Sequence, residues 1–223
     1  NGIIQIIWQN NFDLKFDKLI AKLLNHWYSR FNTLNFNHKK ILDDLIEFSR
    51  QRIISHLEDS LYDKEIISST CESENIRHLN ILDIADLKNR IESIQKFKLR
   101  KNSSNLINII SRYSKLANKG DLENHIYTCK DIINAELFEK KSEKDIFKFL
   151  QLLENFVKTK DWEYIELINL FEKNIEVLVQ IFDNKNGVMV MTEDLNVRTN
   201  RLNLLALVRN YSLLIADFTL LNS

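Results

Sequence analysis

The chain has 223 residues, with no proline, three glycines, 44% hydrophobic residues and 28% charged residues. This composition favours long helices with few special turns, so we predict an all-α protein, a multi-helix bundle with no significant sheet. Its 31 basic and 31 acidic residues cancel, which excludes binding to nucleic acid through a large overall positive charge and leaves only local clusters for such a role.

A membrane location is not indicated by the sequence. No apolar run reaches the length of a membrane span, and no basic stretch followed by an apolar one marks a secretory signal. We therefore expect a soluble, cytoplasmic chain with no membrane partner. Because an apolar helical pattern is already under way at Asn1, we also expect the chain to be part of a longer polypeptide.

The cysteines do not indicate a disulfide or metal site. Cys71 and Cys129 lie far apart in the sequence, and there is no second pair. Cys71 and His78 share one polar stretch, but two ligands without partners do not make a zinc site. We expect both cysteines to be reduced thiols packed in the core.

Residues 1–80 are expected to form a helical segment that packs on a bundle formed by 81–223, although the whole chain may also be read as a single domain 1–223. Hydrophobic residues recur at helical spacing through the first part. The expected elements are a short apolar helix 2–8, a helix 15–31, a long amphipathic helix across 41–57, a short helix near 62–67 and a polar loop 68–80.

Two helices are expected at 82–101 and 103–119, with Gly120 as a C-terminal cap for the second. Between Gln95 and Lys119 the segment carries basic residues and no Asp or Glu. In a neutral chain this is a local cationic surface, and such surfaces contact nucleic-acid phosphates. The alternative is that lysines at helix C-termini simply face water. The basic residues are Lys96, Lys98, Arg100, Lys101, Arg112, Lys115 and Lys119.

Two more helices follow a polar connection. Ser142 with Asp145 has the spacing of a capping box and opens a helix that runs to Lys158. Asp161 is the expected cap of the next helix, 162–182, whose apolar residues form a continuous face.

The last helix is expected to begin at Thr192, whose hydroxyl suits an N-cap. Its hydrophobic residues recur at three- and four-residue steps and predict one apolar face. Arg198, Arg201 and Arg209 lie along this helix. If the helix serves only to pack the core, these arginines are expected to face solvent.

Short motifs follow one another in a fixed order through the C-terminal region. They are Phe182-Asp183, Val188-Met189-Val190-Met191, Glu193-Asp194, Arg198-x-Asn200-Arg201-Leu202, Leu204-Leu205 and Ile215-Ala216-Asp217-Phe218. This series closely resembles the C-terminus of the beta subunit of bacterial-type glycyl-tRNA synthetase, which ends in an all-helical anticodon-binding domain of the DALR type. The eponymous Asp-Ala-Leu-Arg falls on Leu195-Asn196-Val197-Arg198, where only the arginine is identical.

The resemblance covers nearly the whole chain, with its most specific part at 188–218 and supporting matches at 2–14, 86–119 and 162–182. The sequence from Ser111 to Lys119 also resembles the Arg-x-x-Ser/Asn-Ile-x-x-Lys helix of DALR domains, which draws attention to Arg112 and Lys119.

The resemblance implies a function for the parent protein. That enzyme joins glycine to its tRNA with ATP at a site on a separate alpha subunit, while the beta subunit helps to hold the tRNA and its C-terminal domain faces the anticodon arm. The implied partners are the tRNA for glycine, the alpha subunit and the remainder of the beta subunit, in an assembly of two alpha and two beta chains. This region would hold no cofactor and no catalytic residue. In agreement, the sequence contains no glycine-rich phosphate loop, metalloprotease motif or thiol–histidine pair.

We hypothesise that basic side chains contact the anticodon arm. The residues that would contact its phosphates are Lys98, Arg100, Lys101 and Lys119. Splayed bases would be reached by Arg112, Arg198 or Arg201, since RNA sequence is read mostly from unstacked loops. Structural ion pairs are the alternative for the last two, with Glu193, Asp194 or Asp217 as partners.

Two other functions remain open from the sequence. Arg50 and His56 are spaced like the arginine–histidine ribonuclease motif of HEPN domains, in which a cation and a general base act on one phosphodiester. A helical protein-interaction or scaffold module would instead present an apolar surface patch.

Overall fold

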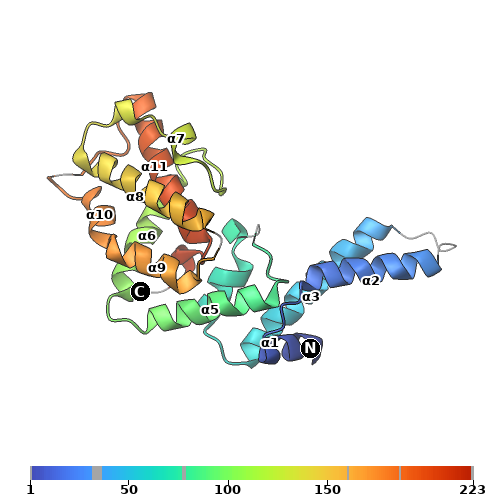
Figure 1. Ribbon diagram of the computed structural model, residues 1–223. Coiled ribbons are helices and arrows are strands. Elements are labelled where there is room, and N and C mark those ends of the chain that lie inside the picture. The colour runs from blue at the N-terminus through green and yellow to red at the C-terminus, as the bar shows by residue number, and fades with distance from the viewer. Residues whose placement is uncertain (1, 32–36, 77–78, 160, 186, 222–223) are drawn as a thin grey trace. The chain divides into compact units, whose positions relative to one another are not determined.

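The computed structural model describes residues 2–31, 37–76, 79–159, 161–185 and 187–221. Within these residues the regular elements are all helical, with one isolated bridge between Lys15 and Asp83 and no strand. The all-α prediction is therefore confirmed (Figure 1). None of the helices in the described ranges is long and apolar enough to cross a membrane.

The chain folds as two compact units, Asn1–Glu92 and Ser93–Ser223, which we call unit 1 and unit 2. Helix α5, Ile84–Lys98, contributes to both. The division into 1–80 and 81–223, made from the sequence, stays a prediction.

Unit 1 is built from helices at its N-terminal side and a series of short turns after them. The helices are α1 (Gly2–Asn10), α2 (Phe16–Arg30), α3 (His38–Asp59) and α4 (Lys64–Ile67), followed by a π-helical turn (Ser68–Glu72) and a 3-10 turn (Glu74–Ile76). Side chains that are at most 1% exposed form its core: Ile53, Leu57, Ile66, Ile67, Cys71, Ile84, Leu87 and Ile91.

The segment 68–80 was expected to be a polar loop, and its first part is instead a buried helical turn. Ser69 and Thr70 are fully buried, and their hydroxyls donate to the carbonyl of Ile66 at 3.0 and 2.6 Å. Because hydroxyls can bond back to helix carbonyls, these polar residues enter the core without losing hydrogen bonds.

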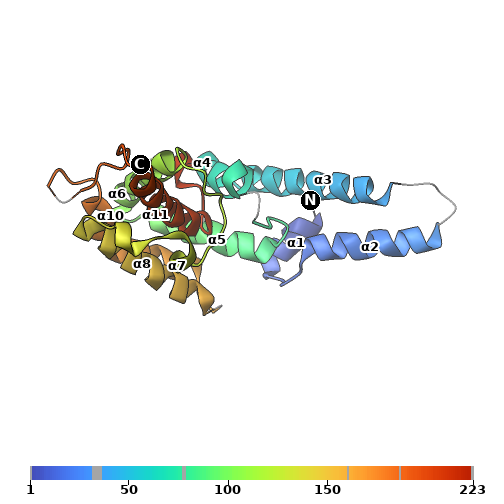
Figure 2. The same cartoon turned by 90° about the horizontal axis from the view of Figure 1, so that it is seen from above.

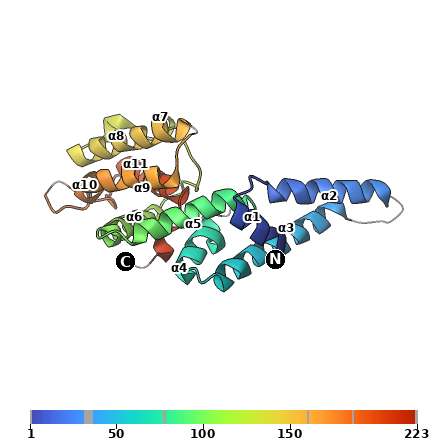
Figure 3. The same ribbon diagram turned by 60° about the horizontal axis from the view of Figure 1, so that its bottom comes forward.

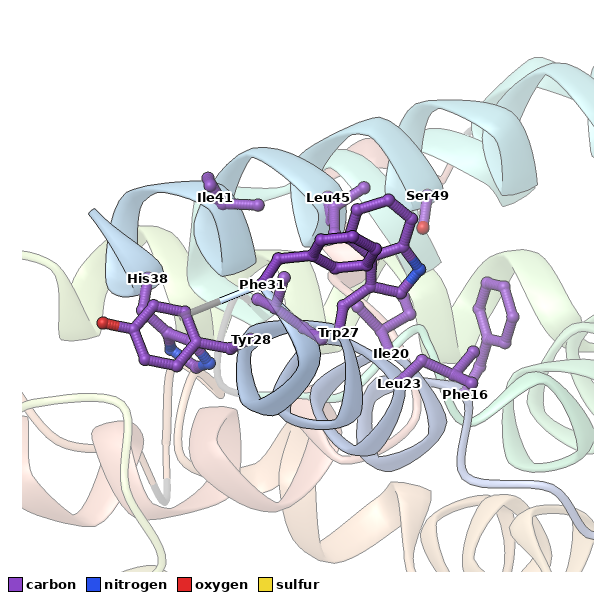
Figure 4. Close-up of a pocket in the computed structure, with 11 residues that line it drawn as sticks. Phe16, Ile20, Leu23, Trp27, Tyr28, Phe31, His38, Ile41, Leu45 and Ser49 are labelled. Carbon is purple, nitrogen blue, oxygen red and sulfur yellow. The ribbon is translucent and has the colours of Figure 1, made fainter. Parts of the chain in front are cut away.

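Helices α2 and α3 run side by side as a hairpin (Figure 2). In α2 only Ile20 is buried, although the helix carries an apolar residue at nearly every third or fourth position. The two apolar stripes line an open groove of about 490 Å³, in which Trp27 and Phe31 stack with ring centroids 4.5 Å apart (Figure 4).

Unit 2 is a bundle around the long C-terminal helix. Its elements are α6 (Ser103–Ala117), α7 (Cys129–Ile132), a 3-10 turn (Ala135–Leu137), α8 (Lys141–Lys158), α9 (Tyr164–Lys173), α10 (Ile175–Gln180), α11 (Leu195–Leu213) and a last 3-10 turn (Phe218–Leu220). Helix α11 packs against α6, α7 and α8, while α9 and α10 lie against α8 (Figure 3).

Helix α11 is buried nearly all round, whereas one apolar face was expected. Every residue from Leu204 to Leu213 is buried. Its N-cap is Asp194 rather than Thr192, because the Asp194 carboxylate accepts the N–H groups of Asn196 and Val197 at 2.8 and 3.1 Å.

The predicted helix 162–182 is two helices that meet at Asn174. The side-chain amide of Asn174 donates to the carbonyl of Leu170 at 2.8 Å, and its backbone has φ −109° and ψ 17°. A side chain that bonds to the preceding turn competes with the regular helix ladder, which ends α9 at Lys173.

Gly120 does not act as a left-handed cap, because no glycine of the described residues has a positive φ. A Cβ at this position would lie 3.1 Å from the Cβ of Leu202. Gly120 therefore allows the connection after α6 to pass close to α11.

Candidate nucleic-acid interface

One face of α6 carries polar and basic side chains that are all exposed. They are spaced by three and four residues, so they follow one another along the same side of the helix. The opposite side packs in the bundle, with Leu106, Ile110 and Tyr113 fully buried. We call this exposed row the α6 stripe: Asn105, Asn108, Arg112 and Lys115 on the helix, and Lys119 in the turn that follows it.

Arg112 is held in place by an aromatic pair. Its guanidinium carbon lies 4.0 Å from the centroid of the Phe182 ring, a cation–π contact. Phe182 meets Tyr113 edge to face at 5.1 Å, and the Tyr113 hydroxyl donates to the carbonyl of Leu178 at 2.9 Å. Burial raises the pKa of Tyr113 well above 10, so it remains a neutral donor. These contacts join α6 to α10.

A groove of about 650 Å³ lies between α6 and α10. The amides of Asn105, Asn108 and Gln180 line it, together with the carboxylates of Glu176 and Asp183. Its remaining walls are Ile109, Arg112, Ile175, Val179 and Phe182.

The other basic residues of the predicted cationic segment divide into two kinds. Lys96 and Lys101 are exposed, and Lys98 is half-buried. Arg100 is also half-buried: it forms an ion pair with Glu172 and donates to the side-chain oxygen of Asn169 at 2.8 Å. Arg100 therefore ties the α5–α6 turn to α9.

Arg201 lies inside unit 2 and is only 3% exposed. It donates to Glu143 Oε1 at 2.8 Å, to Glu139 Oε2 at 2.6 Å and to the carbonyl of Met189 at 3.2 Å. Burial opposes its charge, but the hydrogen bonds to Glu143 and Glu139 raise the pKa of Arg201 above its ordinary value. These contacts support the structural role.

The ion-pair partners that we predicted for Arg201 from the sequence were wrong. Asp194 caps α11, and Asp217 accepts the backbone N–H of Thr219 in the last 3-10 turn. Glu139 and Glu143 take their place because α8 begins beside α11. Arg198 is half-buried on the same helix.

Sequence reasoning missed a second buried polar cluster at Arg209 and Asn210. The Arg209 guanidinium donates to Asn118 Oδ1 at 3.0 Å and to the Leu122 carbonyl at 2.7 Å, and burial lowers its pKa. The Asn210 amide donates to the carbonyls of Glu123 and His125 at 2.8 and 2.6 Å. Together they fasten the connection after α6 to α11.

The ribonuclease alternative gains no support from α3. Arg50 and His56 are six positions apart, so their side chains leave the helix about 120° apart. The Arg50 guanidinium donates to the carbonyl of Cys71, and the His56 ring packs edge-on to Trp8 at 6.0 Å. Each side chain is used in packing unit 1.

No metal-binding cluster occurs in the part of the chain that the structure describes. His78, considered with Cys71 from the sequence, lies outside the described residues. Both cysteines are free and fully buried, as predicted.

The fold and the α6 stripe define the class of protein: an all-helical protein with a local basic surface. No family model matches the chain. It is nevertheless similar to proteins named glycine–tRNA ligase beta subunit. It is 28% identical to that of Acaryochloris marina over 222 residues, which is 98% of this chain and 31% of the relative. With Gloeothece citriformis the identity is 29% over 222 residues, 97% of this chain and 30% of the relative.

The Trichodesmium erythraeum subunit is 25% identical over 223 residues, 98% of this chain and 31% of the relative. The resemblance to the beta subunit of glycyl-tRNA synthetase is therefore confirmed. The chain spans about three tenths of the length of these curated relatives.

Proposed function

We propose that this chain is a non-catalytic region of a glycyl-tRNA synthetase beta subunit that binds the anticodon arm of the tRNA for glycine through a DALR-type helical domain. It would act in the cytoplasm and support the ATP-dependent attachment of glycine, with ATP used on the alpha subunit. Its partners would be the alpha subunit and the remainder of the beta subunit, in the assembly of two alpha and two beta chains. The α6 stripe is the observation that carries this proposal.

The stripe has the charge that phosphate binding requires. Lys115 and Lys119 are exposed, and no ion pair to either is found among the described residues. Lys96 and Lys101, also exposed, extend the basic character to the end of α5 and the following turn. Lysines of this kind release counterions from RNA when they contact phosphates, which gives affinity without sequence preference.

Charge reversal of the stripe tests the proposal. The variant Lys115→Glu/Lys119→Glu is compared with Lys144→Glu/Lys148→Glu, which changes two exposed lysines of α8 by the same charge. Binding of the glycine tRNA is measured by filter retention at two salt concentrations. Reversal on α6 should weaken binding more than about tenfold and lower the salt slope by roughly one per lysine. Equal losses in the two variants would remove the α6 stripe from the interface.

Unit 1 supports a second role, in contact with protein. The α2–α3 groove is almost wholly apolar, and Leu23, Trp27 and Leu45 on its rim are 56%, 60% and 39% exposed (Figure 4). Exposed apolar surface of this kind marks interaction sites. Since the relatives are about three times as long as this chain, we propose that an apolar helix from the remainder of the beta subunit occupies the groove.

Hydrogen exchange tests whether the remainder of the beta subunit occupies the α2–α3 groove. Amides of α2 should exchange more slowly in the complete beta subunit than in this chain alone, because a packed helix suppresses local opening. The amides of α8, on the other unit, serve as the control. The same exchange rates for α2 in both proteins would show that the remainder of the subunit leaves the groove open.

A further inference from the structure

We propose that the groove between α6 and α10 holds one unstacked nucleobase of the bound RNA, and that it prefers a base with an exocyclic amino group. This inference rests on the proposed function and assigns its base-reading site. The α6 stripe then has two parts: the groove end, with Asn105 and Asn108, receives a base, and the Lys115–Lys119 end receives phosphates.

The lining of the groove suits a planar, polar and uncharged ligand. Asn105, Asn108 and Gln180 each offer an amide that both donates and accepts hydrogen bonds, as base edges require. Ile109 and Val179 supply apolar contact for the base plane. A groove of about 650 Å³ has room for a base with its sugar, since pockets for small molecules start at roughly 300 Å³.

The charges of the groove exclude a phosphate from it. Glu176 and Asp183 line it with carboxylates, while Arg112 is its one lining cation among the described residues. A phosphate would meet more negative than positive charge there. Lys115 lies three residues beyond Arg112, about 4.5 Å along the helix axis, and Lys119 lies in the turn that follows α6. The phosphate contacts and the base contacts therefore separate along the α6 stripe.

The same carboxylates give the groove its preference. A carboxylate only accepts hydrogen bonds, so Glu176, which is exposed at the groove wall, favours an amino group such as N4 of cytosine. Uracil has the O4 carbonyl oxygen where cytosine has its N4 amino group, so a Glu176 carboxylate placed to accept from N4 would face an acceptor instead. Discrimination against uracil follows from this unfavourable pairing.

The groove is formed before RNA binds. Arg112 already lies over Phe182 at 4.0 Å, and Tyr113 already bonds to the Leu178 carbonyl in α10. Its walls thus need no large rearrangement, which reduces the entropic cost of binding. The guanidinium of Arg112 also offers a flat cationic surface on which a base can stack.

The test uses an anticodon-arm hairpin of the glycine tRNA in which each loop base is replaced in turn by uracil. The native chain should show one loop position at which uracil weakens binding by about tenfold or more. Glu176→Gln should remove most of this discrimination, because an amide can donate to uracil. Asn105→Ala/Asn108→Ala should weaken binding of all hairpins that place a base in the groove.

The matched control is Asn155→Ala, which removes an exposed amide from α8. The three variants change four residues, all of them exposed, and far-UV circular dichroism and thermal unfolding check that each variant folds. If Glu176→Gln and Asn105→Ala/Asn108→Ala bind every hairpin as the native chain does, the base site is refuted. The proposed function would still stand if Lys115→Glu/Lys119→Glu weakened binding in the same assay. If none of these variants weakens RNA binding, or if the native chain binds no RNA, both the base site and the proposed function are refuted.

Discussion

Arg201 shows how a basic side chain that appears suitable for RNA becomes part of the core. Its guanidinium pairs with Glu143, which is fully buried in α8, and with Glu139, which lies just before that helix. Nothing in the local sequence reveals this, because the glutamates precede Arg201 by some sixty positions. The ion pairs fix α8 against α11 and thereby position the rest of the bundle.

Replacing Arg201 with Met should destabilise the chain strongly. The substitution leaves Glu143 buried without its cation, and breaking a buried pair in this way costs about 3–5 kcal/mol. Arg198→Met, on the same helix and half-buried, is the control and should cost under about 1 kcal/mol. The free energy of unfolding in urea measures both. Similar costs for the two variants would contradict the structural role of Arg201.

The two buried thiols should be unreactive in the native chain. Burial raises the pKa of Cys71 from 9.0 to about 11 and that of Cys129 from 9.0 to about 12. Since the thiolate is the reactive form, a chromogenic disulfide reagent at about pH 8 should modify neither residue quickly, and both in urea. A thiol that reacts rapidly without urea would contradict the burial.

The raised pKa values of the two thiols also make the stability of the chain depend on pH. Between pH 9 and about 11 the unfolded chain loses thiol protons that the folded chain keeps, so the unfolded state binds fewer protons there. Stability therefore falls as pH rises through this window. The variant Cys71→Ala/Cys129→Ala should show a smaller fall in its urea midpoint across the window than the native chain.

At the scale of elements, the sequence predicted the major helices well. Long periodic segments such as α3, α6 and α8 were predicted because their apolar stripes continue over several turns. Boundaries set by a single side chain were not. Asn174 interrupts the helix expected at 162–182, and the periodicity on its two sides gives no sign of the break.

The caps show the same limit. Thr192, Ser142 and Asp161 are all acceptable caps by residue type, yet the N-caps are Asp194 for α11, Lys140 for α8 and Glu163 for α9. Several polar residues occur close together at each of these helix starts, and tertiary packing decides which of them adopts the cap conformation. The cationic segment was visible in the sequence, but the groove was not, because it needs α10 beside α6.

The N-cap of α11 can be tested by single substitutions. Asp194→Ala should lower stability by about 1 kcal/mol, because it removes the acceptor for two free N–H groups of the first turn. Thr192→Ala, at the position favoured by the sequence, should change it by less than about 0.5 kcal/mol. Thermal unfolding compares the two variants. A larger effect at Thr192 would place the helix start there instead.

Gly187 is required by close backbone packing. A Cβ at this position would lie 2.2 Å from the Asp183 carbonyl oxygen and 2.7 Å from that of Ile181, so Gly187→Ala must distort the turn after α10. We expect a loss of about 1–3 kcal/mol in unfolding free energy. Gly2→Ala, where nothing lies within 4 Å of the added atom, is the control. It should be neutral or slightly stabilising in α1. Equal effects would contradict the packing at Gly187.

At the scale of the whole molecule, a neutral chain carries two surfaces with different chemistry. Unit 1 has an apolar groove between α2 and α3, and unit 2 has a polar and basic face on α6. The overall composition does not reveal the basic face, because its charges are balanced by acids elsewhere in the chain. In the function that we propose, the face on α6 contacts RNA and the groove contacts protein.

The most direct test locates the RNA on the protein. An anticodon-arm hairpin of the glycine tRNA, with a photoreactive base in its loop, is crosslinked to the chain and the modified peptides are identified by mass spectrometry. We predict crosslinks within 103–119 and 175–183, the walls of the α6–α10 groove. Crosslinks confined to unit 1, or to the exposed face of α8, would show that the RNA docks elsewhere.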